Sequence, residues 1–80
     1  MPTILAIEGY RFFFYSSDRP ERPHIHIEHG DYTAKVWLDP VRLQDSHGYT
    51  RTEINKILRI IGDKQELLLR RWNEYFHHEK

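Results

Sequence analysis

The sequence contains no cysteine among its 80 residues. This absence excludes disulfide bonds, thiolate metal sites and cysteine nucleophiles. The chain also has no excess of charge of either sign, because 12 Lys and Arg are matched by 12 Asp and Glu and the formal net charge is zero. A nucleic-acid-binding site would therefore have to be a local patch rather than a property of the whole chain.

Long apolar runs are absent as well. No window approaches the roughly 18 apolar residues of a membrane span, and the first residues, Met1-Pro2-Thr3-Ile4, lack the basic and apolar segments of a signal peptide. We therefore expect a cytoplasmic protein with no membrane partner, folded as a single domain over residues 1–80. A small domain without disulfides has little stability margin, so we also expect a protein partner or a homo-oligomer.

The chain contains enough large apolar side chains to form a small core, since 39% of its residues are hydrophobic and 14% are aromatic. Strand-like runs occupy about residues 3–43. Thr3–Ile7 and Tyr10–Tyr15 flank Glu8-Gly9 and predict a hairpin. Residues 41–43 are either a short strand or an extended connector, and residues 44–49 are expected to be a loop.

The segment from His24 to Leu38 predicts a second hairpin, with Gly30-Asp31 as its two-residue turn. This turn aligns the apolar side chains of the two strands on one face of the sheet, namely Ile27 with Ala34 and Ile25 with Val36. The same turn aligns the polar and aromatic side chains on the other face, namely Glu28 with Thr33, His26 with Lys35 and His24 with Trp37. A shift by one residue would place Ile opposite Thr and Lys, so the pattern favours this register.

The second half of the sequence is helical, over about residues 51–77. Thr50 and Glu53 have the spacing of a capping box. Gly62 is followed by Asp63 and Glu66, which predicts a break with Asp63 as the cap of the last helix. The predicted fold class is α+β, with an antiparallel sheet of three to five strands followed by two C-terminal helices packed on one face.

Two imidazoles and a carboxylate on one side of a strand are candidate metal ligands. The three residues are His24, His26 and Glu28. Such a set suits zinc, nickel or iron, and His29 or His47 could add a ligand, although no spacing requires it. The alternative is a sheet surface that simply carries histidine, and the sequence therefore predicts neither a metal nor another cofactor.

The same residues also suit RNA cleavage without a metal. Histidine can move the protons of the 2′-hydroxyl and the 5′-oxygen, and cations stabilise the extra charge on phosphorus. An ammonium beside His26 would favour the neutral imidazole that acts as a base. The catalytic candidates are His24, His26, Lys35 and Arg11. The candidates for binding the nucleic acid are Arg19, Arg22, Trp37 and Tyr15. The alternative is that these are ordinary cross-strand surface pairs.

Nearly the whole chain resembles a family of small bacterial proteins described only as a domain of unknown function. The resemblance rests, in order, on the motifs at residues 1–4, 9–18, 23–27, 34–40 and 72–76, which read MPTI, GYRFFFYSSD, PHIHI, AKVWLDP and WNEYF. The family's Pro-His-x-His segment corresponds to Pro23, His24 and His26. The chain departs from the family at Gly62-Asp63, where relatives are more helix-favouring.

The resemblance implies a gene encoded beside another small protein, in pairs that look like toxin–antitoxin modules. In such a pair this chain would be the toxin, and its partner an antitoxin-like protein. The leading hypothesis is therefore a bacterial toxin with metal-independent ribonuclease activity. The alternative is a non-enzymatic module that binds protein or nucleic acid.

Overall fold

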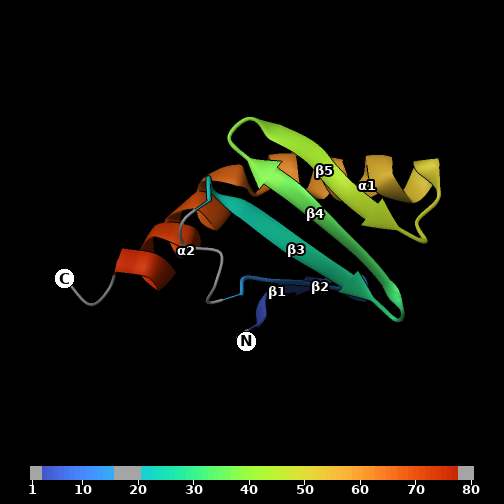
Figure 1. The fold of residues 1–80 in the computed structure, drawn as a ribbon, viewed down its shortest axis with the longest axis horizontal. Coiled ribbons are helices and arrows are strands. Elements are labelled where there is room, and N and C mark those ends of the chain that lie inside the picture. The colour runs from blue at the N-terminus through green and yellow to red at the C-terminus, as the bar shows by residue number, and fades with distance from the viewer. Residues whose placement is uncertain (1–2, 16–20, 78–80) are drawn as a thin grey trace.

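The computed structural model describes residues 3–15 and 21–77. Within these residues the chain forms β1 (Thr3–Ile7), β2 (Tyr10–Phe13), β3 (His24–His29), β4 (Tyr32–Leu38), β5 (Val41–His47), α1 (Arg51–Asp63) and α2 (Gln65–His77). The strands pair in the order β1-β2-β3-β4-β5 as one antiparallel sheet, and both helices lie behind one face of it (Figure 1). The predicted α+β arrangement is confirmed.

Both predicted hairpins are present. Glu8 and Gly9 have positive φ angles of 52° and 87°, as a tight two-residue turn between β1 and β2 requires. Gly30, at φ 62°, begins the turn between β3 and β4. The register of this second hairpin is the predicted one at all six positions from His24↔Trp37 to His29↔Tyr32. Turn chemistry and the two-residue period of the strands together explain this agreement.

The strand bounds differ from expectation at two places. β2 ends at Phe13 rather than at Tyr15, and β5 continues to His47, so the loop expected from residue 44 was wrong for residues 44–47. Lys35 pairs with Asp45 whereas Val36 pairs with Leu43, so β5 carries one extra residue, Gln44. The resulting bulge lets a polar segment, with no regular apolar alternation, pair with β4.

α1 begins where predicted, but the division between the two helices falls later than predicted. The N–H of Glu53 donates to Oγ1 of Thr50 at 3.2 Å and the N–H of Thr50 donates to Oε1 of Glu53 at 3.0 Å, which confirms the capping box. The predicted break is present, but α1 continues through Gly62 and Asp63 to a C-cap at Lys64. The N–H of Lys64 still bonds to the carbonyls of Ile60 and Ile61, each at 3.1 Å, so helical bonding passes beyond the predicted cap.

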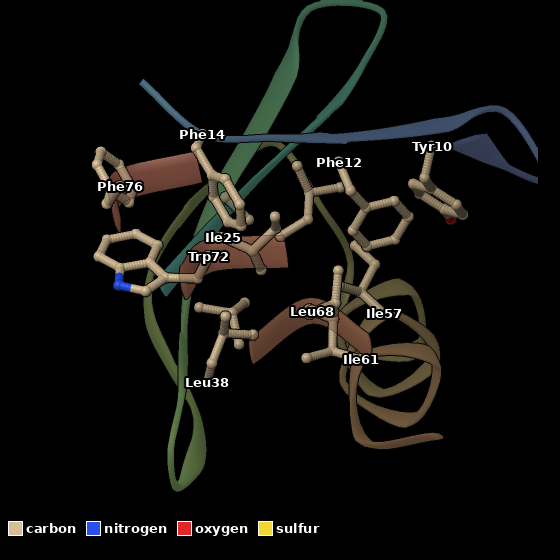
Figure 2. Packing of buried hydrophobic residues seen from close by; sticks show 13 residues of the cluster. Tyr10, Phe12, Phe14, Ile25, Leu38, Ile57, Ile61, Leu68, Trp72 and Phe76 are labelled. Atoms are coloured by element: carbon tan, nitrogen blue, oxygen red, sulfur yellow. The ribbon is translucent and has the colours of Figure 1, made fainter. Parts of the chain in front are cut away.

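The hydrophobic core lies between the sheet and the helices (Figure 2). The strands contribute Tyr10, Phe12, Ile25, Ile27, Ala34, Val36 and Leu38, the segment after β2 contributes Phe14, and the helices contribute Ile57, Ile61, Leu68, Trp72 and Phe76. Of the residues that the structure describes, neither helix is long and apolar enough to cross a membrane. The core therefore occupies one face of the sheet and leaves the other for the polar side chains of the strands.

Candidate functional site

The face of the sheet turned away from the helices carries most of the residues predicted to be functional. We call it the open face. By strand alternation and register it presents Arg11, Phe13, His26, Glu28, Thr33, Lys35, Trp37, Asp45 and His47. Adjacent strands align Phe13, His26, Lys35 and Asp45 as one row across the sheet. Groups from four strands are therefore brought side by side.

A depression of about 250 Å³ lies on this face. Its lining consists of Tyr15, His26, Thr33, Ala34, Lys35, Asp45 and His47. Two imidazoles, one amine, one phenol and one carboxylate thus surround a single surface hollow. These groups can accept and donate protons and can offer one positive charge to an anion.

His26 is held in this depression by aromatic neighbours. Its ring is stacked on Phe13, with centroids 5.6 Å apart and an interplanar angle of 24°, and it meets the ring of Tyr15 at 4.5 Å in an edge contact. The side chain is half-buried, and its cross-strand partner is Lys35. The structure therefore brings together three of the predicted site residues, Tyr15, His26 and Lys35.

His24 lies beside His26 but does not line the depression. Its side chain is fully buried, and its ring centroid lies 5.1 Å from that of His26, 5.6 Å from Trp37 and 5.2 Å from Trp72 of α2. Nδ1 donates to the carbonyl of Arg22 at 2.8 Å. The expectation that both imidazoles lie away from the interior is therefore wrong for His24, because the two indoles pack around it, whereas His26 is half-buried in the depression.

Arg11 and Glu28 form an ion pair. Nε and Nη2 of Arg11 donate to Oε1 of Glu28 at 3.0 and 2.7 Å, and the guanidinium lies 4.2 Å from the centroid of Phe13. Arg11 is not among the residues that line the depression. The carboxylate of Glu28 is directed to Arg11 rather than to His24 and His26, and within residues 3–15 and 21–77 no three His, Asp or Glu side chains are grouped as metal ligands.

Lys35 also has an acidic neighbour. Its Nζ donates to Oε1 of Glu21 at 2.7 Å, and the same ammonium lies 5.2 Å from the ring centroid of Trp37. The guanidinium of Arg22 lies 5.0 Å from that ring, so Arg22 and Trp37 are brought together. Arg19, the remaining candidate, lies outside the described residues. A cationic and aromatic group therefore adjoins the depression at the end of β4.

Sequence reasoning missed Asp45 and considered His47 only as a possible added metal ligand. Nε2 of His47 lies 3.1 Å from Oδ2 of Asp45, and both side chains line the depression. Their i, i+2 spacing places two side chains on one face of a strand, which was the available signal. The signal was not used because residues 44–49 were expected to be a loop.

Two pKa shifts concern groups outside the depression. Burial raises the pKa of Tyr49 to about 12, and the nearby Tyr10, Glu53 and Glu28 add to the increase by disfavouring a negative charge. The hydroxyl of Tyr49 donates to the carbonyl of Tyr32 at 3.1 Å. A hydrogen bond to Glu8 likewise raises the pKa of Lys56, with both groups at the surface. Neither group lines the depression.

Comparison with known proteins identifies the family of the chain. No curated protein and no solved structure matches the chain. A family model described as a domain of unknown function (DUF4160) matches residues 9–73. The match includes β2 to β5, all of α1 and most of α2, and so contains every lining residue of the depression. The chain belongs to the DUF4160 family of domains of unknown function.

Proposed function

We propose that this chain is the toxin of a bacterial toxin–antitoxin pair, and that it cleaves RNA in the cytoplasm, without a metal, at the depression on the open face. The observation that carries the proposal is the juxtaposition of His26 and Lys35 on paired strands within a surface hollow. An antitoxin-like protein encoded beside it is the proposed partner. The pairing of genes rests on the resemblance described above.

The chemistry of RNA cleavage matches this pair of side chains. The 2′-hydroxyl must lose a proton to a base, and the phosphorus centre gains negative charge in the transition state. The imidazole of His26 supplies the base, and the ammonium of Lys35 supplies the positive charge. At about 250 Å³ the hollow is smaller than the usual drug-sized pocket of about 300–1,000 Å³, and it suits one phosphodiester rather than a large enclosed ligand.

The surroundings of the depression favour a nucleic-acid substrate. Tyr15 is 39% exposed at its wall, and Trp37 lies with Arg22 at the end of β4. Aromatic rings on a sheet surface stack the bases of single-stranded RNA, and guanidinium groups bind phosphates. In this proposal the flanking residues bind the bases and phosphates of the RNA, while His26 and Lys35 carry out the cleavage.

A second candidate is a non-enzymatic module that binds protein. The ion pairs of the open face favour it, because Lys35 bonds to Glu21 and Arg11 bonds to Glu28, which reduces the positive charge offered to RNA. Leu43 and Tyr32 add exposed apolar surface, at 37% and 44% exposure. In the ribonuclease proposal, a substrate phosphate must displace Glu21 from Lys35.

The test is to induce the chain alone and with the product of the adjacent gene, and to measure growth and RNA integrity. We expect arrest and RNA cleavage by the chain alone, persistence of cleavage by purified protein in EDTA, and suppression by the neighbour. His26→Ala should reduce the cleavage rate by about 100-fold or more. His29→Ala is the matched control, because His29 lies on the same strand but does not line the depression.

Two results would contradict the ribonuclease. One is wild-type protein that cleaves no RNA, and the other is His26→Ala protein as active as His29→Ala. Circular dichroism of each variant separates loss of activity from loss of fold. Tight binding of the neighbour by a chain that neither arrests growth nor cleaves RNA would support the non-enzymatic module.

A further inference from the structure

The depression contains a second imidazole, that of His47, which lies on the opposite side of β4 from His26 and pairs with Thr33. Lys35 pairs with His26 on one side and with Asp45 on the other, and His47 follows Asp45 on β5. All four side chains line the same hollow. Two imidazoles, from β3 and β5, therefore line one hollow on opposite sides of β4, and an in-line displacement at phosphorus needs its base and its acid on opposite sides of the phosphorus.

The two imidazoles have different partners. His26 has Lys35 as its cross-strand neighbour and is packed against Phe13 and Tyr15. His47 instead bonds through Nε2 to the carboxylate of Asp45 at 3.1 Å. An ionised carboxylate can only accept, so Nε2 of His47 donates and Nδ1 is the nitrogen left to act on a substrate.

We propose that His47, oriented by Asp45, is the general acid of a cleavage in which His26 is the general base, and that the substrate is single-stranded RNA. This inference rests on the ribonuclease function proposed above. A protonated His47 forms an ion pair with Asp45 and has a proton to give at Nδ1. In the same step the neutral ring of His26, on the other side of β4, accepts a proton from the substrate.

The step balances without a metal or a redox partner. His26 takes the proton of the 2′-hydroxyl, and O2′ forms a bond to the adjacent phosphorus. The bond from phosphorus to O5′ breaks, and O5′ takes the proton from Nδ1 of His47. The products are a 2′,3′-cyclic phosphate and a free 5′-hydroxyl. DNA has no 2′-hydroxyl and is not cleaved.

The assignment of the acid is tested with two short single-stranded RNA substrates, one natural and one with sulfur in place of the leaving O5′. A thiolate leaves without being protonated, so loss of the general acid matters only for the oxygen substrate. His47→Ala should be slower than wild type by about 100-fold or more on the oxygen substrate and nearly equal to wild type on the sulfur substrate. His26→Ala should be slow on both.

Asp45 is a positioning residue, and its substitution should change the cleavage rates in a way that differs from the loss of His47. Asp45→Asn should lose less rate than His47→Ala on the oxygen substrate and should likewise recover on the sulfur substrate. The side chains of His47 and Asp45 are 71% and 59% exposed, so these substitutions remove little packing. His29→Ala again serves as the control that retains activity on both substrates.

The outcomes separate the two proposals. If wild-type protein cleaves the oxygen substrate but His47→Ala is equally slow on both substrates, or is as fast as wild type on both, the assignment of His47 is overturned and the ribonuclease remains. If wild-type protein cleaves neither substrate, the ribonuclease and the assignment are overturned together. Products other than a 2′,3′-cyclic phosphate would also overturn the assignment.

Discussion

Three histidines of strand β3 lie in three environments, although the strand is only six residues long. His24 is fully buried, His26 is half-buried in the depression, and His29 is exposed next to Tyr10. Alternation alone would give His24 and His26 the same exposure. The difference comes from Trp37 and Trp72, whose rings pack around His24. The exposure of a residue at the end of a strand thus depends on which side chains from other elements cover it.

Tyr49 allows a test of burial at a single residue. Its folded-state pKa of about 12 exceeds the ordinary value of 10.0, so the unfolded chain ionises first. The contribution of its neutral hydroxyl is therefore fully present below pH 10 and is lost as the pH rises toward 12. We expect wild type to exceed Tyr49→Phe in free energy of unfolding by about 1 kcal/mol near neutral pH, through the bond to the carbonyl of Tyr32.

This difference should decrease as the pH rises above 10, because phenylalanine has no proton to lose. Urea unfolding of both proteins across a pH series measures it. Tyrosinate absorbance gives an independent reading, in which one late-titrating group of wild type is missing from the variant. A difference that stays constant with pH would contradict the raised pKa.

At the scale of elements, two glycines near the ends of α1 have opposite roles. Gly48 precedes α1 with a φ of 97°, and a Cβ at this position would overlap the ring of Tyr32. Gly62 lies within α1, and a Cβ there would meet no atom within 4 Å. Gly62 is therefore an ordinary helical position, and the division between α1 and α2 falls at Lys64 without needing a glycine conformation.

We expect Gly62→Ala to increase the free energy of unfolding by about 0.5–1 kcal/mol, because alanine favours the helix and restricts the unfolded chain. Gly48→Ala should decrease it by about 1 kcal/mol or more, because alanine is strained at that φ and collides with Tyr32. Urea unfolding, with a comparison of midpoints at unchanged slope, measures both. A destabilised Gly62→Ala protein would mean that the break between the helices depends on Gly62 after all.

At the scale of the whole molecule, the sheet and the helices share one hydrophobic cluster. Trp72 of α2 connects the sheet side of this cluster with the helix side, and its ring centroid lies 5.2 Å from that of Phe14 and 4.3 Å from that of Phe76 (Figure 2). Its ring also contacts that of His24. This side chain is 4% exposed. Sheet and helix should therefore unfold together, as is usual for small domains.

Trp72→Ala should cost about 3–5 kcal/mol, a large part of the roughly 4–12 kcal/mol expected for a chain of this length. Trp37→Ala is the matched control, and it should cost less because Trp37 is only partly buried on the open face. Urea unfolding followed by far-ultraviolet circular dichroism measures both. Equal losses of unfolding free energy in the two variants would contradict the role of Trp72 in holding the sheet and the helices together.

The prediction of the second hairpin succeeded because its determinants are local. Gly30-Asp31 specifies a two-residue turn, and the alternation of Ile25 and Ile27 with polar residues specifies the register. The capping box of Thr50 and Glu53 succeeded for the same reason. Each of these features is encoded within one short stretch of neighbouring residues, where turn geometry and side-chain period act directly.

The candidate site was predictable only in part. The pairing of His26 with Lys35 follows from the hairpin register and was predicted correctly. The position of Tyr15 beside His26 depends on β2 lying next to β3, and the pairing of Arg11 with Glu28 depends on the same contact. Such contacts join residues far apart in sequence, so no local pattern specified them.

The sequence by itself determined the class of elements, the turn between β3 and β4 and the neighbours of His26 on that hairpin, because these follow from local periodicity and turn chemistry. Tertiary structure alone decided that β5 extends to His47, that Asp45 and His47 complete the depression, and that His24 is enclosed by two indoles. The physical reason is that strand pairing and burial are set by contacts between distant segments, which can override the local preference of a polar run.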